Sequence, residues 1–246
     1  MIAFDDEIKK RVHQNSKNKN LIKSGNKFLL DSIKPKYSYN FKWLNRPIIQ
    51  YPQDIVAIQE LIWETEPDLI IECGVAHGGS VILSASILAL LNMKIKKKRM
   101  VLGIDIEVRP KNKKILNNHF LKKYIKLIEQ SSIDKKTIAK VANIAKKYKK
   151  VLIFLDSSHT YEHVLKELEL YSQFVSKNSY IVVFDTTIGK FKNKNLYPNR
   201  PWNFKNSPMQ SVKKFVKNDK KFIIDKKWNN KLIISQCFDG FLKKIK

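Results

Sequence analysis

Short apolar runs alternate with longer amphipathic stretches along most of the chain, from about residue 68 to residue 235. The run LIIEC at residues 69–73 is rich in β-branched residues and is followed by Gly74, which is typical of a buried parallel strand. We predict strands at residues 69–73, 100–105, 124–130, 151–156, 179–185, 222–225 and 232–235, and helices at residues 80–93, 111–121, 134–148, 160–175 and 208–216. Such alternation predicts an α/β fold with helices on both faces of a parallel sheet.

The first 54 residues follow a different pattern. Residues 5–20 are highly polar and predict a loosely held helix, whereas residues 28–54 mix aromatic residues with prolines and predict an ordered, irregular flap. A helix at residues 55–64 then leads into the first strand. Because neither an internal repeat nor a flexible Gly/Ser linker is present, we divide the chain only into an N-terminal segment, 1–54, and an α/β domain, 55–246.

The composition indicates a globular protein of a reducing compartment. Of the 246 residues, 43% are hydrophobic and 11% aromatic, which is enough for a core. The longest uncharged apolar stretch, residues 81–93, is shorter than the roughly 20 residues that cross a bilayer. The N-terminus lacks the apolar region of a secretory signal, and Cys73 and Cys237 are too few for a disulfide framework. We therefore expect a cytoplasmic protein without a transmembrane segment.

The chain is strongly basic, with 48 Lys and Arg against 22 Asp and Glu and a formal net charge of +26. The lysines are spread over several predicted helices and loops rather than clustered in one segment. A dispersed excess favours a solvated surface over a nucleic-acid interface, since a positive field attracts any polyanion but specifies none. Acidic glycans, nucleic acid and anionic lipid all stay open as partners, with nucleic acid the less favoured.

Polar side chains collect at the carboxyl ends of the predicted strands. In an open α/β sheet, ligands bind at this edge, where the strand order reverses. The side chains and glycines placed there are Glu72, Gly74, Asp105, Ser131, Asp156, His159 and Asp185. Any one acid or serine after a strand can instead cap the next helix. Convergence from five strands favours a binding site over five separate caps.

The turn after the first strand, ECGVAHGGS at residues 72–80, has the features of a cofactor loop. Gly74, Gly78 and Gly79 let the backbone approach a ligand, and the helix that follows offers unpaired N–H groups to a carboxylate or phosphate. The turn also fits a loosened dinucleotide pattern, so glycines alone do not separate S-adenosylmethionine (SAM) from NAD. The acid Glu72 suits a ligand that carries an ammonium group, and this favours SAM.

Four ordered segments carry a family resemblance: residues 43–80, GIDIEVRP, LDSSHTYEHVLKELELY and SYIVVFDT. Together they resemble the rhamnosyl O-methyltransferase and cephalosporin hydroxylase family, a branch of the class I SAM-dependent methyltransferases. The resemblance implies a Rossmann-like, seven-stranded, mostly parallel sheet of order 3-2-1-4-5-7-6 with an antiparallel last strand. It also implies methyl transfer to a hydroxyl, commonly on a sugar of a glycolipid, polysaccharide or natural product. Without a 2-His-1-carboxylate pattern at iron-ligand spacing, we do not expect oxygenase activity.

The same resemblance assigns roles to the residues at the sheet edge. It implies that a group of residues holds the methionine part of SAM, namely Glu72, Gly74, Gly78, Gly79 and Ser80. Asp105 would accept the ribose hydroxyls, and Ser131 would lie in the turn that faces adenine. Asp156 and Asp185 would bind Mg²⁺ as they do in metal-dependent relatives. Those relatives often have a further acid where this chain has Phe184, so the presence of a metal stays open.

Methyl transfer to a sugar hydroxyl needs a base or a metal, because that hydroxyl is a weak acid. We predict that His159 is the base and that Asp156 and Asp185 support it. The acceptor is predicted to lie between the N-terminal flap and the loop at residues 189–208, a lid that has aromatic residues among lysines and arginines. Aromatic faces stack on sugars and cations bind acidic groups, so an anionic glycan is the preferred acceptor.

Other functions also fit the residues. A nucleic-acid methyltransferase would use the same cofactor half and the basic surface, although the chain lacks a [DN]-P-P-[YFW] signature after the strand that ends at Asp185. A non-catalytic glycan-binding protein with a vestigial SAM fold is a second alternative, and an NAD-dependent enzyme is a weaker one. The sequence leaves the acceptor, the biosynthetic pathway and a homo-oligomeric state open.

Overall fold

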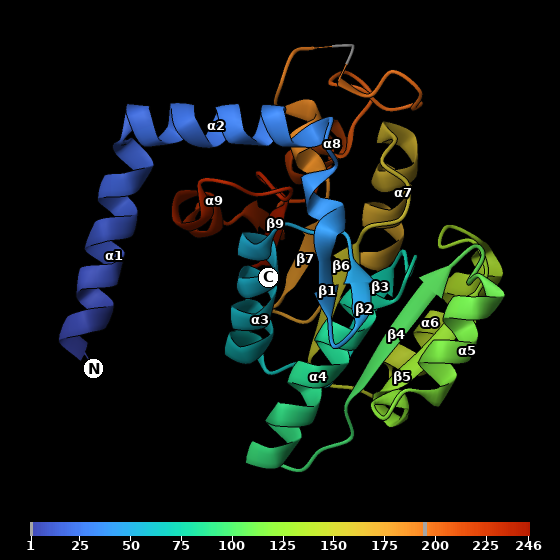
Figure 1. Ribbon diagram of the computed structural model, residues 1–246. Helices are drawn as coiled ribbons and strands as arrows, with labels where there is room; N and C mark the ends of the chain where they lie inside the picture. Colours follow the sequence, from blue (N-terminus) through green and yellow to red (C-terminus); the bar gives the residue numbers. More distant parts are fainter. Residues whose placement is uncertain (1, 194–195) are drawn as a thin grey trace.

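The computed structural model describes residues 2–193 and 196–246 and has a seven-stranded sheet at its centre (Figure 1). In spatial order, the strands are β5 (Ile125–Glu129), β4 (Met100–Asp105), β3 (Leu69–Cys73), β6 (Val151–Leu155), β7 (Tyr180–Val183), β9 (Phe241–Lys244) and β8 (Phe222–Ile224). β3 pairs in parallel with β4 and β6, while β9 is antiparallel to both β7 and β8. Counted from β3, this is the order 3-2-1-4-5-7-6, so the predicted fold class is confirmed.

Helices cover both faces of the sheet because successive strand residues point to opposite sides. Ile70 packs in one core with residues of α3 (Pro52–Thr65) and α4 (Gly79–Lys94). Its neighbour Ile71 packs in a second core, with residues of α6 (Lys135–Ala145), α7 (Tyr161–Tyr171) and α8 (Pro208–Asn218). The short helix α5 (Pro110–Asn118) adds Leu116 to the first core. With every residue of β3 and β6 buried, the chemistry of these strands lies at their ends.

The predicted strand at residues 232–235 is wrong. Its first residue closes helix α9 (Lys226–Leu232), and Ile233 follows with a φ of +58°, which stops the helix. Hydrogen bonds from Ser235 Oγ (2.6 Å) and Gln236 N (2.8 Å) to the Asp54 carboxylate then hold the chain as a loop. The last strand is β9 instead, where Lys244 Nζ donates to the carbonyl of Val175 at 2.8 Å. The two lysines of this strand, Lys243 and Lys244, interrupt its apolar pattern, so the sequence did not mark it as a strand.

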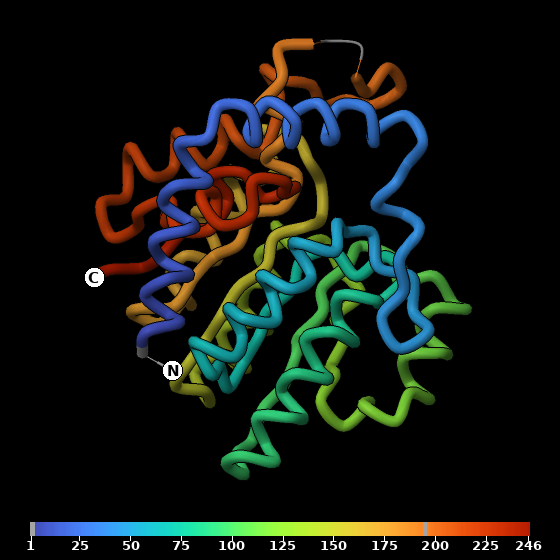
Figure 2. The backbone as a smooth tube through the Cα atoms, turned by 60° about the vertical axis from the view of Figure 1, so that its left-hand side comes forward, coloured from blue at the N-terminus to red at the C-terminus, as the bar shows by residue number. Residues whose placement is uncertain are grey.

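The N-terminal segment is more helical than predicted. The polar helix is α1 (Ile2–Lys17), and a second helix, α2 (Lys19–Ile33), takes in the start of the predicted flap. The rest of the flap is a 3₁₀ turn at Tyr37–Asn40 and a hairpin of β1 (Phe41–Trp43) and β2 (Arg46–Ile48), after which α3 begins at Pro52. In Figures 1 and 2, α2 crosses the top of the molecule and α1 runs down beside α9, with which it is in contact. The division at residue 54 stays a prediction.

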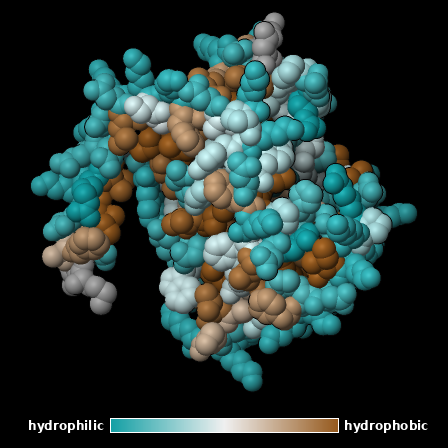
Figure 3. Space-filling view, in the orientation of Figure 1, coloured by the Kyte–Doolittle hydropathy of each residue, from teal (hydrophilic) through white to brown (hydrophobic). Residues whose placement is uncertain are grey.

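Polar residues are prominent on the face of the molecule drawn in Figure 3. Figure 3 shows hydrophilic residues over most of the visible face, including α1. Across the described residues, no helix combines the length and the apolar character needed to cross a membrane.

Both cysteines, Cys73 and Cys237, are buried free thiols, and burial raises the pKa of each.

Candidate functional site

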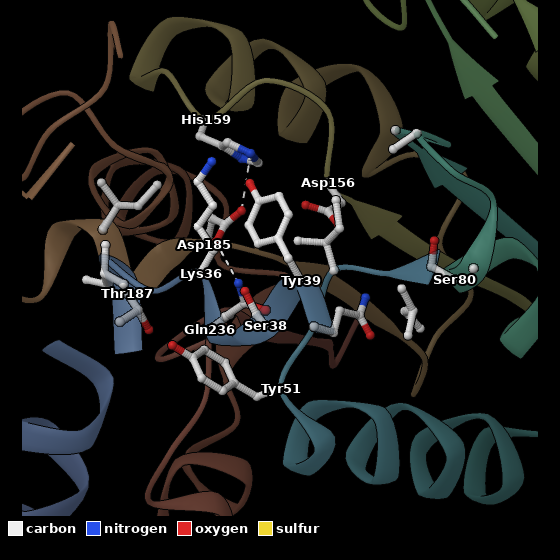
Figure 4. A pocket seen from close by; sticks show the side chains of 18 of the residues that line it. Lys36, Ser38, Tyr39, Tyr51, Ser80, Asp156, His159, Asp185, Thr187 and Gln236 are labelled. Carbon is white, nitrogen blue, oxygen red and sulfur yellow. Dashed lines mark hydrogen bonds and ion pairs between the residues drawn. The ribbon is translucent and has the colours of Figure 1, made fainter. Parts of the chain in front are cut away.

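A cavity of about 280 Å³ opens at the carboxyl ends of β3, β6 and β7 (Figure 4). Its floor is formed by the glycine-rich turn after β3 and by the residues that follow β6 and β7. Its walls are formed by the end of α2, the 3₁₀ turn, the chain after β2 and the described part of the loop at residues 189–208. The two segments predicted to enclose an acceptor, the flap and the lid loop, therefore both line one cavity.

Two acids and a histidine lie together at the cavity floor. Asp156 follows β6 and Asp185 follows the neighbouring strand β7, so the pairing of these strands brings the two acids to one edge. His159 Nε2 lies 3.2 Å from Asp185 Oδ2, and one side-chain ligand atom from each of the three residues lies within 4.8 Å of the others. Asp185 has a φ of +53° at the start of a 3₁₀ turn, Thr186–Gly189, and Thr187 and Ile188 of this turn also line the cavity.

The carboxylates under the cavity lack cationic partners. Burial raises the pKa of Asp156 well above its ordinary value, and the nearby charges of Asp185 and Glu72 raise it further. Burial also raises the pKa of Glu72 to about 8, although Ser80 Oγ donates a hydrogen bond to its Oε1. The other oxygen of Glu72 is buried without a partner, and within the described residues no Lys or Arg forms an ion pair with these three acids. A ligand with positive charge would relieve this repulsion.

The glycine-rich turn is shaped by close packing of the backbone. A Cβ at Gly74 would lie 1.9 Å from the carbonyl oxygen of Asp156, and one at Gly79 would lie 2.2 Å from that of Pro47. Gly74 also has a φ of +97°, which favours glycine. These two glycines therefore join the turn to the end of β6 and to the hairpin. Both line the cavity together with Ser80.

Asp105 holds this turn from outside the cavity. Its Oδ2 accepts hydrogen bonds from Val75 N at 2.8 Å and Ala76 N at 3.1 Å, and its Oδ1 accepts one from Glu107 N at 3.2 Å. The structure thus places Asp105 against the cofactor turn, with both carboxylate oxygens already bonded to backbone. Its predicted contact with ribose stays a prediction.

The cavity brings together some of the predicted site residues and leaves others aside. Those that line it are Gly74, Gly79, Ser80, Asp156, His159 and Asp185. Those that do not are Glu72, Gly78, Asp105 and Ser131. Glu72 borders a separate void of about 10 Å³ that shares Ser80 and Asp156 with the cavity, so it lies directly beneath the floor. Gly78 faces Leu116, and the Ser131 carbonyl accepts a hydrogen bond from Asp134 N.

The lid loop contributes aromatic and basic side chains. Trp202 meets the His159 ring edge-on, with the ring centroids 4.8 Å apart, and the Arg200 guanidinium lies 5.1 Å from the centroid of the Trp202 ring. Tyr197 also lines the cavity, and burial raises its pKa. Lys194, another basic residue of this loop, lies outside the described residues.

Sequence reasoning missed several cavity residues. Lys36, Tyr39 and Tyr51 come from the flap, which was predicted only as a whole to face the acceptor. Gln236 comes from the loop after α9, and its Nε2 donates to Asp185 Oδ1 at 3.3 Å. The proline- and aromatic-rich composition of the flap was a signal for the first three. No local signal marks Gln236, because the fold alone brings it there.

Comparisons with known proteins identify the family of this chain. A protein-family model described as Rhamnosyl O-methyltransferase/CmcI matches residues 35–245. A rhamnosyl O-methyltransferase of Mycobacterium tuberculosis is 30% identical over 137 residues, which is 55% of this chain and 52% of that protein. One from Mycobacterium leprae is 27% identical over 147 residues, 59% of this chain and 60% of that protein. The chain thus spans little more than half the length of the curated relatives it matches.

Solved structures share the fold at low sequence identity. An apo structure of CmcI has a TM-score of 0.58 at 16% identity and covers 85% of this chain and 77% of that one. An O-methyltransferase from Bacillus cereus in complex with S-adenosylhomocysteine (SAH) has a TM-score of 0.51 at 13% identity, with 81% of each chain covered. Since the family model covers most of the sequence, this chain belongs to the rhamnosyl O-methyltransferase/CmcI family.

Proposed function

We propose that this protein is a SAM-dependent O-methyltransferase that acts on a hydroxyl of a sugar in a polysaccharide, glycolipid or natural product. The observation that carries the proposal is the cavity at the strand ends. Its carboxylates form no ion pair with a Lys or Arg of the described residues, and they lie beside a glycine-rich turn. Membership of a family whose curated relatives are called rhamnosyl O-methyltransferases supports the sugar acceptor.

The residues present fit SAM as the cofactor. Its ammonium and sulfonium groups are positive, and the partly buried Asp156 and the fully buried Glu72 form no ion pair with a Lys or Arg of the described residues. The carboxylate of SAM would meet the start of α4, where Gly79 and Ser80 line the cavity and the first N–H groups of the helix lack intrahelical acceptors. Bound SAM would supply an electrophilic methyl group and leave as SAH.

His159 would accept the proton of the sugar hydroxyl. Because its Nε2 faces Asp185 Oδ2 at 3.2 Å, an Nε2–H that donates to this oxygen leaves the lone pair on Nδ1 free. Asp185 would hold the ring in that tautomer and stabilise the imidazolium that forms. The ring of Trp202 packs against the imidazole in a T-shaped contact, with the ring centroids 4.8 Å apart.

Asp156 and Asp185 would hold a divalent cation if the enzyme is metal-assisted. One solved structure of CmcI is described as a complex with Mg and SAM. Two carboxylates that follow neighbouring strands and form no ion pair with a Lys or Arg in the described part of the chain suit a hard cation. Such a cation would lower the pKa of a sugar hydroxyl next to it.

An anionic sugar is the acceptor that the cavity walls favour. Lys36 and Arg200 line the cavity, and Tyr39 and Trp202 offer aromatic faces on which a sugar ring can stack. Tyr39 is 52% exposed, so its ring is open to a ligand. These side chains lie on the flap and the lid loop.

The test is a methyl-transfer assay with radiolabelled SAM and a panel of rhamnosides, uronic-acid glycans and RNA. We expect label in a sugar, and a Trp202→Ala variant with at least tenfold lower kcat/KM for the acceptor and unchanged SAH affinity. Trp63→Ala removes a tryptophan that is 41% exposed on α3, outside the cavity, and serves as the matched control. Label in RNA alone, or equal loss of acceptor use and SAH binding in Trp202→Ala, would contradict the proposal.

A further inference from the structure

Asp185 has a second polar neighbour besides His159. Gln236 Nε2 donates to Asp185 Oδ1 at 3.3 Å, whereas His159 lies at Oδ2, so the two side chains flank the carboxylate (Figure 4). The other amide atom, Gln236 Oε1, is buried without a hydrogen-bond partner in the described residues. An oxygen acceptor on the residue next to Asp185 is therefore left without a hydrogen bond, and such a group calls for an explanation.

The position of Gln236 is built by its surroundings. Its backbone N–H donates to Asp54 Oδ2 at 2.8 Å, and Asp54 is itself only 1% exposed. Its carbonyl accepts from Thr186 Oγ1 and from Thr187 N, each at 3.2 Å. These bonds join the loop after α9 to α3 and to the turn that carries Asp185. The side chain of Gln236 thus starts from a fixed point next to this acid.

The spacing suits a shared cation. Rotation of the terminal amide by about 180° exchanges its oxygen and nitrogen, which have nearly the same size. The oxygen would then lie about 3 Å from Asp185 Oδ1, and neighbouring ligands of an octahedral Mg²⁺, each at about 2.1 Å, are roughly 3 Å apart. Amide and carboxylate oxygens are both suitable ligands for Mg²⁺ and Mn²⁺.

We propose that Gln236 is an oxygen ligand of the divalent cation held by Asp156 and Asp185, and that His159 is thereby left free to accept a proton. The proposal rests on the proposed function, because it concerns the metal of that same site. Without Gln236, the cluster supplies only two carboxylates and an imidazole, and the imidazole would have to serve as ligand and base at once. With Gln236, three oxygen side chains surround the cation and one oxygen of Asp185 still faces His159.

The competing interpretation is that Gln236 only orients Asp185 through a hydrogen bond. The two interpretations predict opposite effects when the amide is removed. If Gln236 is a metal ligand, its removal weakens metal binding. If Gln236 is only a hydrogen-bond donor, its removal leaves metal binding equal or tighter, because the amide no longer competes with the metal for Asp185 Oδ1. Gln236→Leu removes both amide atoms at similar size, and Gln236→Glu keeps an oxygen in place.

The experiment measures Mn²⁺ binding to the full chain by electron paramagnetic resonance and by calorimetry with Mg²⁺. We expect Gln236→Leu to raise the Kd for Mn²⁺ at least tenfold and Gln236→Glu to bind at least as tightly as the wild type. Gln173→Leu makes the same change on an exposed side chain after α7 and should leave the Kd unchanged. Thermal unfolding without metal checks that each variant is folded.

The outcomes separate this inference from the proposed function. Unchanged or tighter Mn²⁺ binding in a folded Gln236→Leu, or equal loss in Gln236→Leu and Gln236→Glu, would overturn it. So would a wild type that methylates sugars yet binds no divalent cation, and in that case the proposed function stands. SAH binding measured with the metal chelated tests the function alone.

Discussion

At the scale of single residues, the site depends on acids that are placed where charge is costly. Glu72 is buried within β3, Asp156 is partly buried directly after the neighbouring strand β6, and no described basic side chain pairs with either acid. Natural proteins seldom keep such groups unless a ligand, a metal or a proton compensates them. The sequence predicted these acids from their positions after apolar runs. It could not predict Gln236, because only the return of the chain after α9 brings that residue to Asp185.

Replacement of the proposed base tests its role. In His159→Gln, we expect kcat to fall by about 100-fold or more, within the range that general-base catalysis contributes. The affinity for SAH should stay within about twofold, since the proposal places the ring at the acceptor rather than at the cofactor. Steady-state kinetics and calorimetry measure the two quantities. A variant with nearly full turnover would exclude His159 as the base.

At the scale of elements, strand order and turn geometry assemble the cavity. The apolar runs predicted five parallel strands and their helices because buried strands have a clear period and length. The same reasoning failed at the C-terminus, where Lys244 in β9 is charged yet bonded to backbone carbonyls, and at α2, where polar residues hide a helix that lies over the site. In both places, tertiary contacts outweigh local pattern.

The glycine-rich turn gives a prediction at this scale. Gly79→Ala would place a Cβ 2.2 Å from the Pro47 carbonyl oxygen, so the hairpin and the turn must separate. We expect a loss of about 1–3 kcal/mol in the free energy of unfolding, as for other overpacked sites, together with weaker SAH binding. Urea unfolding and calorimetry measure both effects.

Ala76→Gly is the matched control in the same turn. Ala76 has a φ of +45°, a region that costs an L-residue roughly 1 kcal/mol, so glycine should leave stability equal or raise it slightly. If Gly79→Ala were as stable as the wild type and bound SAH normally, the packing of the turn on the hairpin would not matter for the site.

At the scale of the whole molecule, the charges are distributed unevenly. The chain has a formal charge of +26, yet Asp156 and Asp185 line the cavity, Glu72 lies beneath it, and Asp54 is buried and bonded to the backbone of Gln236. Burial raises the pKa of Asp54 from its ordinary 3.8 to about 7. The basic surface attracts anionic molecules, while the acidic floor suits the cationic groups of a cofactor or metal.

The buried Asp54 makes stability depend on pH. The folded state keeps its proton between about pH 4 and pH 7, where the unfolded chain loses it, so unfolding releases a proton and stability falls as the pH rises. The contribution is about 1.4 kcal/mol per pH unit within this window. Asp54→Asn keeps an acceptor for Gln236 N and a donor for Ser235 Oγ. We therefore expect the free energy of unfolding to depend less steeply on pH in this variant.

Urea unfolding at several pH values measures this dependence. The acid Glu72, with a pKa raised to about 8, acts in the same direction and remains in the variant, so the slope should decrease without vanishing. A wild type whose stability rises steadily from pH 4 to pH 7 would show that the Asp54 carboxyl is ionised in the folded protein.

The central claim is that the cavity at the carboxyl ends of β3, β6 and β7 binds SAM. Calorimetric titration with SAH, on the wild type and on Asp105→Ala, tests it most directly. We predict a micromolar Kd for the wild type and at least tenfold weaker binding for Asp105→Ala, which is about 1.4 kcal/mol or more, because this acid holds the turn at Val75 and Ala76. A folded wild type that gives no heat with SAH at millimolar concentration would contradict it.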